Sequence, residues 1–279
     1  PVMVKRIVVP TDFSAASGGA LVYARHLAAQ LEAKVVVVHV YHPSFDLNNP
    51  YLDVPVNDFG RVKQEALENF LQEFDERVQQ EAPPVFSPQT EILVGFAGEE
   101  IVQYAADGDM IVMGTTGSGK KGLEKVFGSV SSHVAQHAHT PVLLVPTDAN
   151  YRKVRKVMYA SNHDSADEAL LNKALSESGI RPEVVHFVHA DRREGVECRI
   201  AEVRYEQLVE NAASGVPMQF VELDCEHISE GLYRYAQEQD VDLIVMGTVH
   251  RNFLQRLFHR SVTRQMISHS DIPLLIMHF

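Results

Sequence analysis

The stretch Asp109-Met-Ile-Val-Met-Gly-Thr115 returns as Asp242-Leu-Ile-Val-Met-Gly-Thr248, 133 residues further along the chain. Each copy is a short apolar run that ends in glycine, which is typical of a strand buried on both faces of a parallel sheet. Downstream of each copy, the segment at 140–146 returns at 272–278. Segments that recur in the same order at this spacing predict tandem domains.

Each half of the chain is long enough to form a domain. The 279 residues exceed one average domain, and the start of the first half, 6–14, returns weakly at 156–164. We therefore predict one domain over residues 1–148 and a second over 153–279. The linker is so short that the two domains are expected to pack against each other.

Short apolar runs alternate with helical patterns in both halves. Strands that alternate with helices predict right-handed crossovers and an α/β fold, with a doubly wound, Rossmann-like sheet of five parallel strands in each half. The predicted strands lie at 6–11, 34–41, 90–95, 110–114 and 141–146 in the first half, and at 154–160, 183–189, 218–223, 243–247 and 273–277 in the second.

Charge and composition narrow the functional classes. A net charge of −12 leaves no basic surplus to neutralise phosphates, so neither nucleic acid nor an anionic membrane is expected as a partner. Cys198 and Cys225 form no close-spaced pair, which fits a reducing compartment. Because no apolar run approaches the roughly 20 residues that cross a bilayer and no signal peptide is recognisable, we expect a cytoplasmic protein.

Pro10-Thr11-Asp12-Phe13-Ser14 forms the turn after the first predicted strand. In an open α/β sheet, ligands bind beyond the carboxyl ends of the strands, where the strand order reverses. Asp12 can accept a hydrogen bond from an amino or hydroxyl group of a ligand, and Ser14 is placed to cap the following helix. The alternative is that Asp12 only shapes the turn.

A glycine-rich loop follows the fourth predicted strand and precedes a helix that begins near Ser129. Gly114 and Gly117 allow the backbone to approach a ligand without a Cβ between them. Gly128 and Ser129 are expected to offer free backbone N–H groups and the positive end of a helix dipole, which together favour a phosphate group.

These residues resemble the universal stress protein family, twice over nearly the whole chain. ATP-binding members carry Gly, two residues, Gly, nine residues, Gly and Ser or Thr. The resemblance implies the adenine nucleotide alpha hydrolase-like form of the fold. It also implies a site for ATP or AMP, with no metal beyond the Mg²⁺ that accompanies ATP.

The resemblance assigns roles to individual residues. By this resemblance, Asp12 and the backbone of Val40 hold adenine, and Gly114 lies against the ribose and first phosphate. The phosphates are cradled by Gly117, Gly128 and Ser129. The loop departs from the family pattern, because ten residues separate the second glycine from the third. An extra loop residue costs little entropy, but it shifts the loop over the phosphates.

The second half keeps the pattern of strands and helices but lacks most of the residues of the predicted nucleotide site. Gly247 matches Gly114, but His250 and Arg260 stand where the other two glycines stood, and Asn162 takes the place of Asp12. Side chains at these positions keep phosphate from bare backbone, so we predict a degenerate site. The alternative is that the basic residues of this loop bind another anion.

No catalytic or metal site emerges from the motifs. The sequence contains neither a nucleophile elbow nor a Gly-Lys-Ser/Thr phosphate loop. His133 and His137 lie one helical turn apart, and His139 follows, but no carboxylate or cysteine completes a ligand set. A solvated helix face is the preferred interpretation.

Three functional hypotheses follow. The leading one is a nucleotide-responsive stress protein that binds ATP or AMP in its first domain. The second is a slow ATPase, for which no water-activating residue is evident. The third is a protein-interaction scaffold with neither site occupied. We expect the two domains to pair within the chain through the edge segments 141–145 and 273–277, and a homodimer remains open.

Overall fold

The structure is a computed structural model that describes residues 4–42, 56–81, 87–115, 128–147, 149–161, 167–191, 215–226, 228–248 and 271–278. The strands of the first half are β1 (Arg6–Pro10), β2 (Lys34–Tyr41), β3 (Gln89–Val94), β4 (Asp109–Gly114) and β5 (Val142–Val145). Those of the second half are β6 (Lys156–Ser161), β7 (Val184–Asp191), β8 (Met218–Asp224), β9 (Leu243–Thr248) and β10 (Leu274–His278). The described helices are α1 (Ala15–Leu31), α2 (Val56–Glu81), α3 (Ala97–Tyr104), α4 (Ser129–His137), α5 (Asp167–Ser178) and α7 (Ile228–Glu238).

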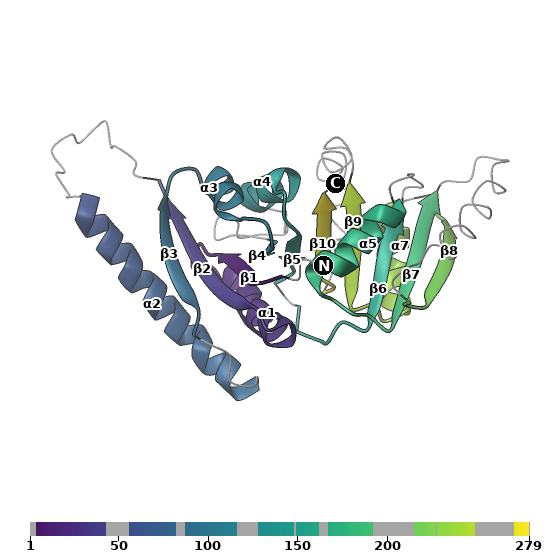
Figure 1. Cartoon of the computed structure of the whole chain (residues 1–279), viewed down its shortest axis with the longest axis horizontal. Coiled ribbons are helices and arrows are strands. Elements are labelled where there is room, and N and C mark those ends of the chain that lie inside the picture. Colours follow the sequence, from purple (N-terminus) through teal and green to yellow (C-terminus); the bar gives the residue numbers. More distant parts are fainter. Residues whose placement is uncertain are drawn as a thin grey trace.

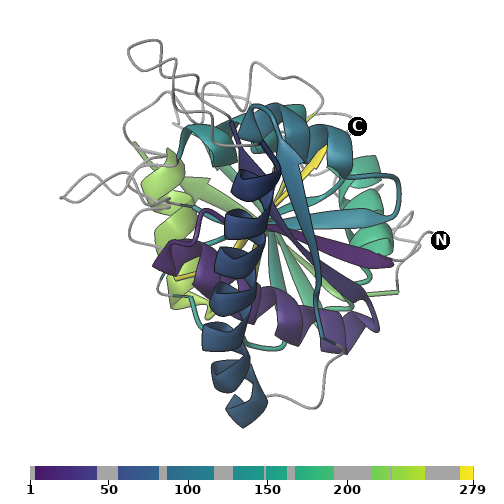
Figure 2. The same ribbon diagram turned by 90° about the vertical axis from the view of Figure 1, so that its left-hand side faces the viewer.

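All ten strands form one sheet, in the order β3-β2-β1-β4-β5-β10-β9-β6-β7-β8 (Figure 1). Within each half the pairs are parallel, and the strand order reverses between β1 and β4 and again between β6 and β9. The predicted doubly wound α/β fold is therefore confirmed. Seen along the row of strands, the sheet fans out, as the right-handed twist of β-strands requires (Figure 2).

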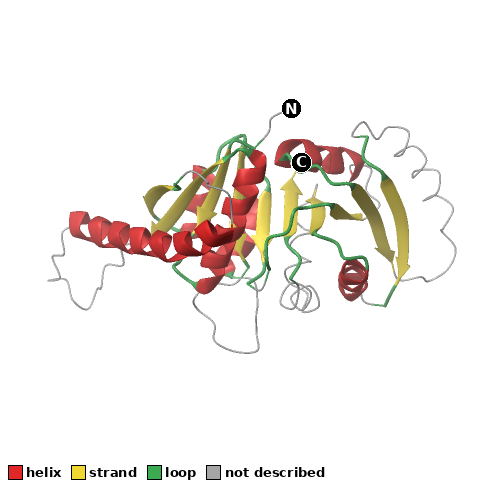
Figure 3. Ribbon diagram, turned by 90° about the horizontal axis from the view of Figure 1, so that it is seen from below, coloured by secondary structure: helices red, strands yellow, loops and turns green. Residues whose placement is uncertain are grey.

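Helices cover both faces of the sheet because the strands are apolar on both sides (Figure 3). On β2, Val35 and Val37 belong to one core cluster, while Val36 and Val38 belong to another. The first cluster packs under α1, α2 and α5, and the second under α3, α4 and α7. No helix within the described ranges is long and apolar enough to cross a bilayer.

The two halves join through their last strands. β10 pairs with β5 in antiparallel fashion, with Leu274 opposite Leu144, Leu275 opposite Leu143 and Ile276 opposite Val142. All six side chains are buried. The predicted pairing within one chain is confirmed, and it covers an edge of each five-stranded sheet that would otherwise be exposed.

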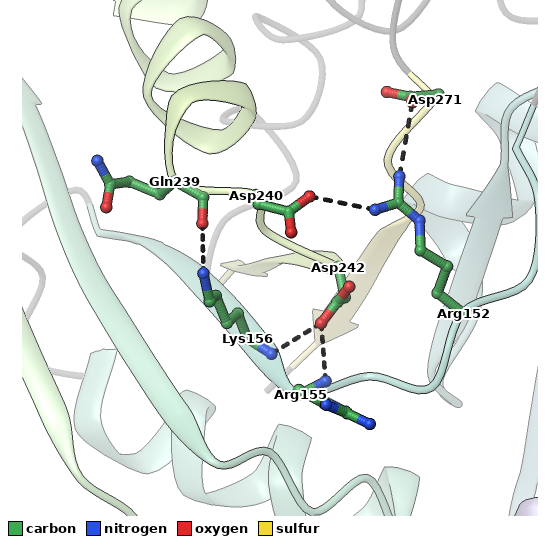
Figure 4. Close-up of polar contacts among 7 residues, drawn as sticks. All are labelled: Arg152, Arg155, Lys156, Gln239, Asp240, Asp242 and Asp271. Carbon is green, nitrogen blue, oxygen red and sulfur yellow. Dashed lines mark hydrogen bonds and ion pairs between the residues drawn. The ribbon is translucent and has the colours of Figure 1, made fainter.

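The linker contacts both halves. Tyr151 stacks on His26 of α1 with ring centroids 4.9 Å apart, and its hydroxyl donates to the Gln30 side chain at 2.7 Å. The next residue, Arg152, reaches the second half, where it pairs with Asp240 at 3.1 Å and lies 3.8 Å from Asp271 (Figure 4). These anchors hold the linker against both domains, as its length predicted.

The first residue of each repeated stretch, Asp109 or Asp242, links two neighbouring strands by hydrogen bonds at their amino ends. Asp109 accepts two hydrogen bonds from the Arg6 guanidinium, at 3.0 and 2.5 Å, and so ties β4 to β1. Asp242 accepts the main-chain N–H groups of Arg155 and Lys156, at 2.8 and 2.9 Å, and ties β9 to β6 (Figure 4). The repeated aspartate thus has a structural role at the edge of the sheet opposite the predicted site.

Candidate functional site

Beyond β1 the chain stops pairing with both of its neighbouring strands, β2 and β4. The pairing of β1 with β2 ends at Pro10 opposite Val38, followed by one bond from the Thr11 N–H to the Val38 oxygen at 2.8 Å. The pairing with β4 ends earlier, at Val8 opposite Ile111. The end of β1 therefore stands apart from its neighbours at the point where the strand order reverses, which is where open α/β sheets bind ligands.

Side chains of the turn after β1 fix its shape. The Thr11 hydroxyl accepts the Phe13 N–H at 3.0 Å, and the Asp12 carboxylate accepts the Ser14 N–H at 3.1 Å. Ser14 in turn accepts the Ser17 N–H at 3.2 Å, which confirms the predicted cap of α1. Asp12 is exposed and shapes the turn, so its contact with a ligand stays a prediction.

Phe13 occupies a backbone conformation that is unusual for a side chain of its size. Its φ of 63° lies in the left-handed region, which costs about 1–2 kcal/mol for a residue other than glycine. The ring is held over His39 with centroids 4.3 Å apart and lies edge-on to Phe70 at 5.7 Å. Packing between the turn, β2 and α2 therefore maintains the strained conformation, a pattern that concentrates at functional sites.

The departure of β1 exposes the main chain of Val40. Both backbone groups of a strand residue point to the same side, and successive residues alternate. The Tyr41 oxygen accepts the Gly95 N–H at 3.0 Å, so residue 41 faces β3 and Val40 faces the place that β1 has left. Neither the N–H nor the C=O of Val40 has a hydrogen-bond partner in the described part of the chain. These two groups form a donor and acceptor pair at the carboxyl edge of the sheet.

The second half lacks this opening. There the pairing continues to Ser161 opposite His189, one step beyond the pair that corresponds to Pro10 and Val38. In a parallel ladder, the pairing of Ser161 with His189 includes a hydrogen bond from the Ala190 N–H to the Ser161 oxygen. Ala190 is the counterpart of Val40. The two halves therefore differ in the main chain as well as in their glycines.

A histidine bond recurs in both halves. The Nδ1 atom of His39 lies 2.9 Å from the Thr11 oxygen, and the Nδ1 atom of His189 lies 3.0 Å from the Ser161 oxygen, across the same sequence separation of 28 residues. His39 is 7% exposed, and its Nε2 atom has no partner among the described residues. Sequence reasoning missed this role, although the equal spacing from the two strand ends carries the signal.

The unfolding free energy should fall with acid partly because of His39. Burial lowers the pKa of His39 from its ordinary 6.5, and the charge of Lys63 acts in the same direction, against the hydrogen bond to Thr11. The unfolded chain then binds more protons, so this contribution is present above pH 6.5 and is lost as the pH falls through the lowered value. One extra proton gives a slope of at most about 1.4 kcal/mol per pH unit.

Urea titrations between pH 5 and 8 measure this slope. His39→Gln, whose amide can still donate to the Thr11 oxygen, should flatten it below pH 6.5. The matched control is the same substitution at an exposed position, His139→Gln. Equal slopes for the parent and His39→Gln would remove His39 as the cause.

Two matched glycines lie at the carboxyl ends of their strands: Gly114 is the last residue of β4, and Gly247 is the last but one of β9. Neighbouring protein atoms explain both. A Cβ on Gly114 would lie 2.7 Å from the main-chain oxygen of Ala16, so glycine is required there for α1 to approach β4. A Cβ on Gly247 would lie 2.6 Å from the hydroxyl of Tyr159 and 2.7 Å from Leu170. Helix packing thus suffices to explain the recurrence of glycine, and contact between Gly114 and a ligand stays a prediction.

Of the N–H groups expected to be free at the start of α4, that of Ser129 has no partner among the described residues, whereas that of Gly128 has one. The N–H of Gly128 donates to the Thr115 oxygen at 3.0 Å, so the expectation that it is free was wrong. No side chain caps this helix. The N–H groups of Ser129 and Val130 lie in its first turn, where no helical acceptor exists, and no described residue accepts them.

In the second half a buried carboxylate lies at the end of the first strand. Asp167 is 3% exposed and accepts the hydroxyls of Tyr159 and Ser161 at 3.1 and 2.5 Å. The corresponding positions of the first half hold two neutral hydroxyls, Thr11 and Ser17, 2.9 Å apart. A buried carboxyl group thus lies in the second half where the first half has the hydroxyl of Ser17.

The described site residues gather at one edge of the first half. Asp12 follows β1, Val40 is the last residue but one of β2, and Gly114 ends β4. Gly128 precedes α4 and Ser129 begins it. The remaining predicted positions lie outside the described residues. They are Gly117 in the first half and Asn162, His250, Arg260 and Ser261 in the second.

Among the described residues no group of three or more His, Cys, Asp or Glu side chains could hold a metal ion. His133 and His137 stack with ring centroids 4.2 Å apart, and the Nδ1 atom of His137 lies 2.8 Å from the His133 oxygen. That nitrogen is thus engaged with the helix backbone.

The fold and its open strand end define a duplicated, doubly wound α/β protein whose pairing of β1 stops early at the switch point of its first half. The family model of the universal stress protein family matches residues 3–146 and again residues 153–278. The chain belongs to this family and carries its domain twice in tandem.

Relatives of known name support the same assignment. A universal stress protein of Methanocaldococcus jannaschii is 37% identical over 145 residues, which cover 50% of this chain and 81% of the relative. A second one from that organism is 31% identical over 157 residues, covering 52% and 96%. The crystal structure of a universal stress protein from Archaeoglobus fulgidus superposes with a TM-score of 0.67 at 19% identity, covering 99% of this chain and 97% of that one, and shows the shared fold.

Proposed function

We propose that the first domain binds an adenine nucleotide, ATP or AMP, and that the protein is a nucleotide-responsive stress regulator. The observation that carries the proposal is the main chain of Val40 at the switch point, which has no hydrogen-bond partner among the described residues. Val40 is half-buried, and backbone groups removed from water rarely lack partners, so this donor and acceptor beside a strained turn invite a ligand.

Adenine matches the Val40 backbone in chemistry. Its N6 amino group donates while the neighbouring ring nitrogen accepts, so one edge of the base can bond to the C=O and N–H of a single strand residue. Guanine presents an acceptor at O6 and a donor at N1, which reverses the order. Asp12 lies in the adjacent turn and is exposed, and its carboxylate is a further acceptor for the amino group or a ribose hydroxyl.

The phosphates have a separate partner at the same edge. The N–H groups of Ser129 and Val130 at the start of α4 are unpaired among the described residues, and the helix dipole adds positive potential there. The glycine spacing that resembles the ATP-binding members lies between β4 and this helix. Because the net charge of the chain is −12, an anion needs a local site of positive potential such as this one.

Calorimetric titration of the full chain with ATP, AMP and GTP tests the proposal. We expect ATP and AMP to bind and GTP to bind at least tenfold more weakly, because its base cannot make both Val40 bonds at once. Equal affinity for GTP and ATP would rule out base reading by Val40. A chain that binds none of the three would leave the first domain without the proposed ligand.

A further inference from the structure

The last residue of β10, His278, bonds across the joint between the two halves. Its Nε2 atom lies 2.8 Å from the main-chain oxygen of Ala135 in α4. Because a carbonyl oxygen can only accept, the Nε2 N–H is the donor. The main-chain oxygen of His278 accepts the Lys173 ammonium of α5 at 2.7 Å, so the histidine is held from the second half. A side chain of the second half thus contacts the helix whose start is proposed to receive phosphate in the first.

The strand register explains why His278 reaches α4. β5 and β10 lie side by side at the middle of the sheet (Figure 1). Their antiparallel pairing ends at Ile276 opposite Val142, the first residue of β5. Met277 and His278 continue along β9 on the other side. They therefore run past the start of β5, toward the segment that joins α4 to β5.

The bonded oxygen lies near the end of α4, where a helix has no donors of its own. The Ala138 N–H donates to the Val134 oxygen at 2.9 Å, and among the described residues no backbone N–H bonds to the Ala135 oxygen that follows. Ala135 is 0% exposed, so water does not replace the missing donor and the His278 side chain supplies it. α4 has only nine residues, and a helix this short depends on such tertiary contacts.

The matching position of the first half carries no such donor. Because residues 140–146 recur at 272–278, the counterpart of His278 is Pro146. The proline ring has neither an N–H group nor another polar atom. At this pair of positions the bond therefore runs in one direction only, from the second half to a helix of the first.

We propose that His278 is a positioning residue for the nucleotide site of the first domain, because its bond to the end of α4 holds the start of that helix where the phosphates bind. This inference rests on the proposed function. Ser129 and Ala135 are about 9 Å apart along the helix axis, so a short rigid helix that moves at one end also moves at the other. ATP affinity in the first domain then depends on a contact made by the second.

Calorimetric titration of three full-length variants tests this role. His278→Leu keeps a side chain of similar size that cannot donate, whereas His278→Gln carries an amide nitrogen at about the place of Nε2. We expect His278→Leu to weaken ATP binding about three- to tenfold and His278→Gln to stay within about twofold of the parent. The matched control is Tyr151→Phe, which removes a 2.7 Å bond to Gln30 of α1, on the opposite face of the sheet from α4, and should leave ATP affinity unchanged.

Adenosine separates the positioning of α4 from a general loss of structure. It has no phosphate, so its affinity should be the same in the parent and in His278→Leu, while that of ATP falls. Unchanged ATP affinity in His278→Leu, equal losses for ATP and adenosine, or a His278→Gln protein as weak as His278→Leu would each refute the positioning role and leave the proposed function standing. A parent chain that binds no nucleotide would overturn both proposals.

Discussion

Replacing Leu275 by aspartate should unfold the second domain or separate it from the first. Leu275 is 1% exposed and lies opposite Leu143 in the antiparallel pair that joins the two sheets. Removing a buried leucine costs about 2–5 kcal/mol, and an unpaired buried charge adds several more. Such a loss is comparable to the whole stability of a domain, about 5–15 kcal/mol.

Circular dichroism melts and gel filtration measure this effect. The matched control is Val94→Asp, on the outer edge strand β3, where the side chain is 52% exposed and a carboxylate remains in water. We expect Val94→Asp to lie within about 0.5 kcal/mol of the parent. A Leu275→Asp protein of parental size with a parental melt would show that the joint between β5 and β10 is dispensable.

The second large effect is expected at Gly128. Gly128→Arg should lower ATP affinity at least tenfold, about 1.4 kcal/mol, because a long side chain would stand at the start of α4. There it would lie beside the N–H groups of Ser129 and Val130, which have no partner among the described residues. The backbone of Gly128, with φ −61° and ψ 152°, suits any residue, so the melt should stay close to the parent's. The second domain carries Arg260 at the matching sequence position.

Charge must be separated from shape in this experiment. Gln72→Arg adds the same charge on an exposed position of α2. Attraction between the chain and ATP alone would strengthen binding in both variants, whereas blocked access weakens it only in Gly128→Arg. Unchanged ATP affinity in Gly128→Arg would mean that phosphate does not lie at the start of α4.

Much of the fold follows from local pattern. The short apolar runs predicted β4 and β9, and the recurrence of 140–146 at 272–278 predicted which strands join the halves. Ser14 was recognisable as a cap because a hydroxyl just before an apolar helical pattern has few other roles. These features depend on residues close in sequence or on the repeat itself.

The candidate site was less accessible to sequence reasoning because it depends on where pairing stops. The main chain of Val40 is open because the pairing of β1 with β2 ends one residue earlier than that of β6 with β7. No residue type in the sequence indicates where this pairing ends. The role of Gly114 in helix packing depends on the distance to Ala16, which lies far away in sequence.

The number of ATP molecules bound per chain tests the central claim most directly. In the described part of the chain, one domain has an open strand end and unpaired N–H groups at its α4 helix, while the other has an extended ladder and the buried side chain of Asp167. Calorimetric titration of the full chain should therefore saturate near one ATP per chain. Two equivalent sites per chain, or no saturable binding at all, would contradict the account.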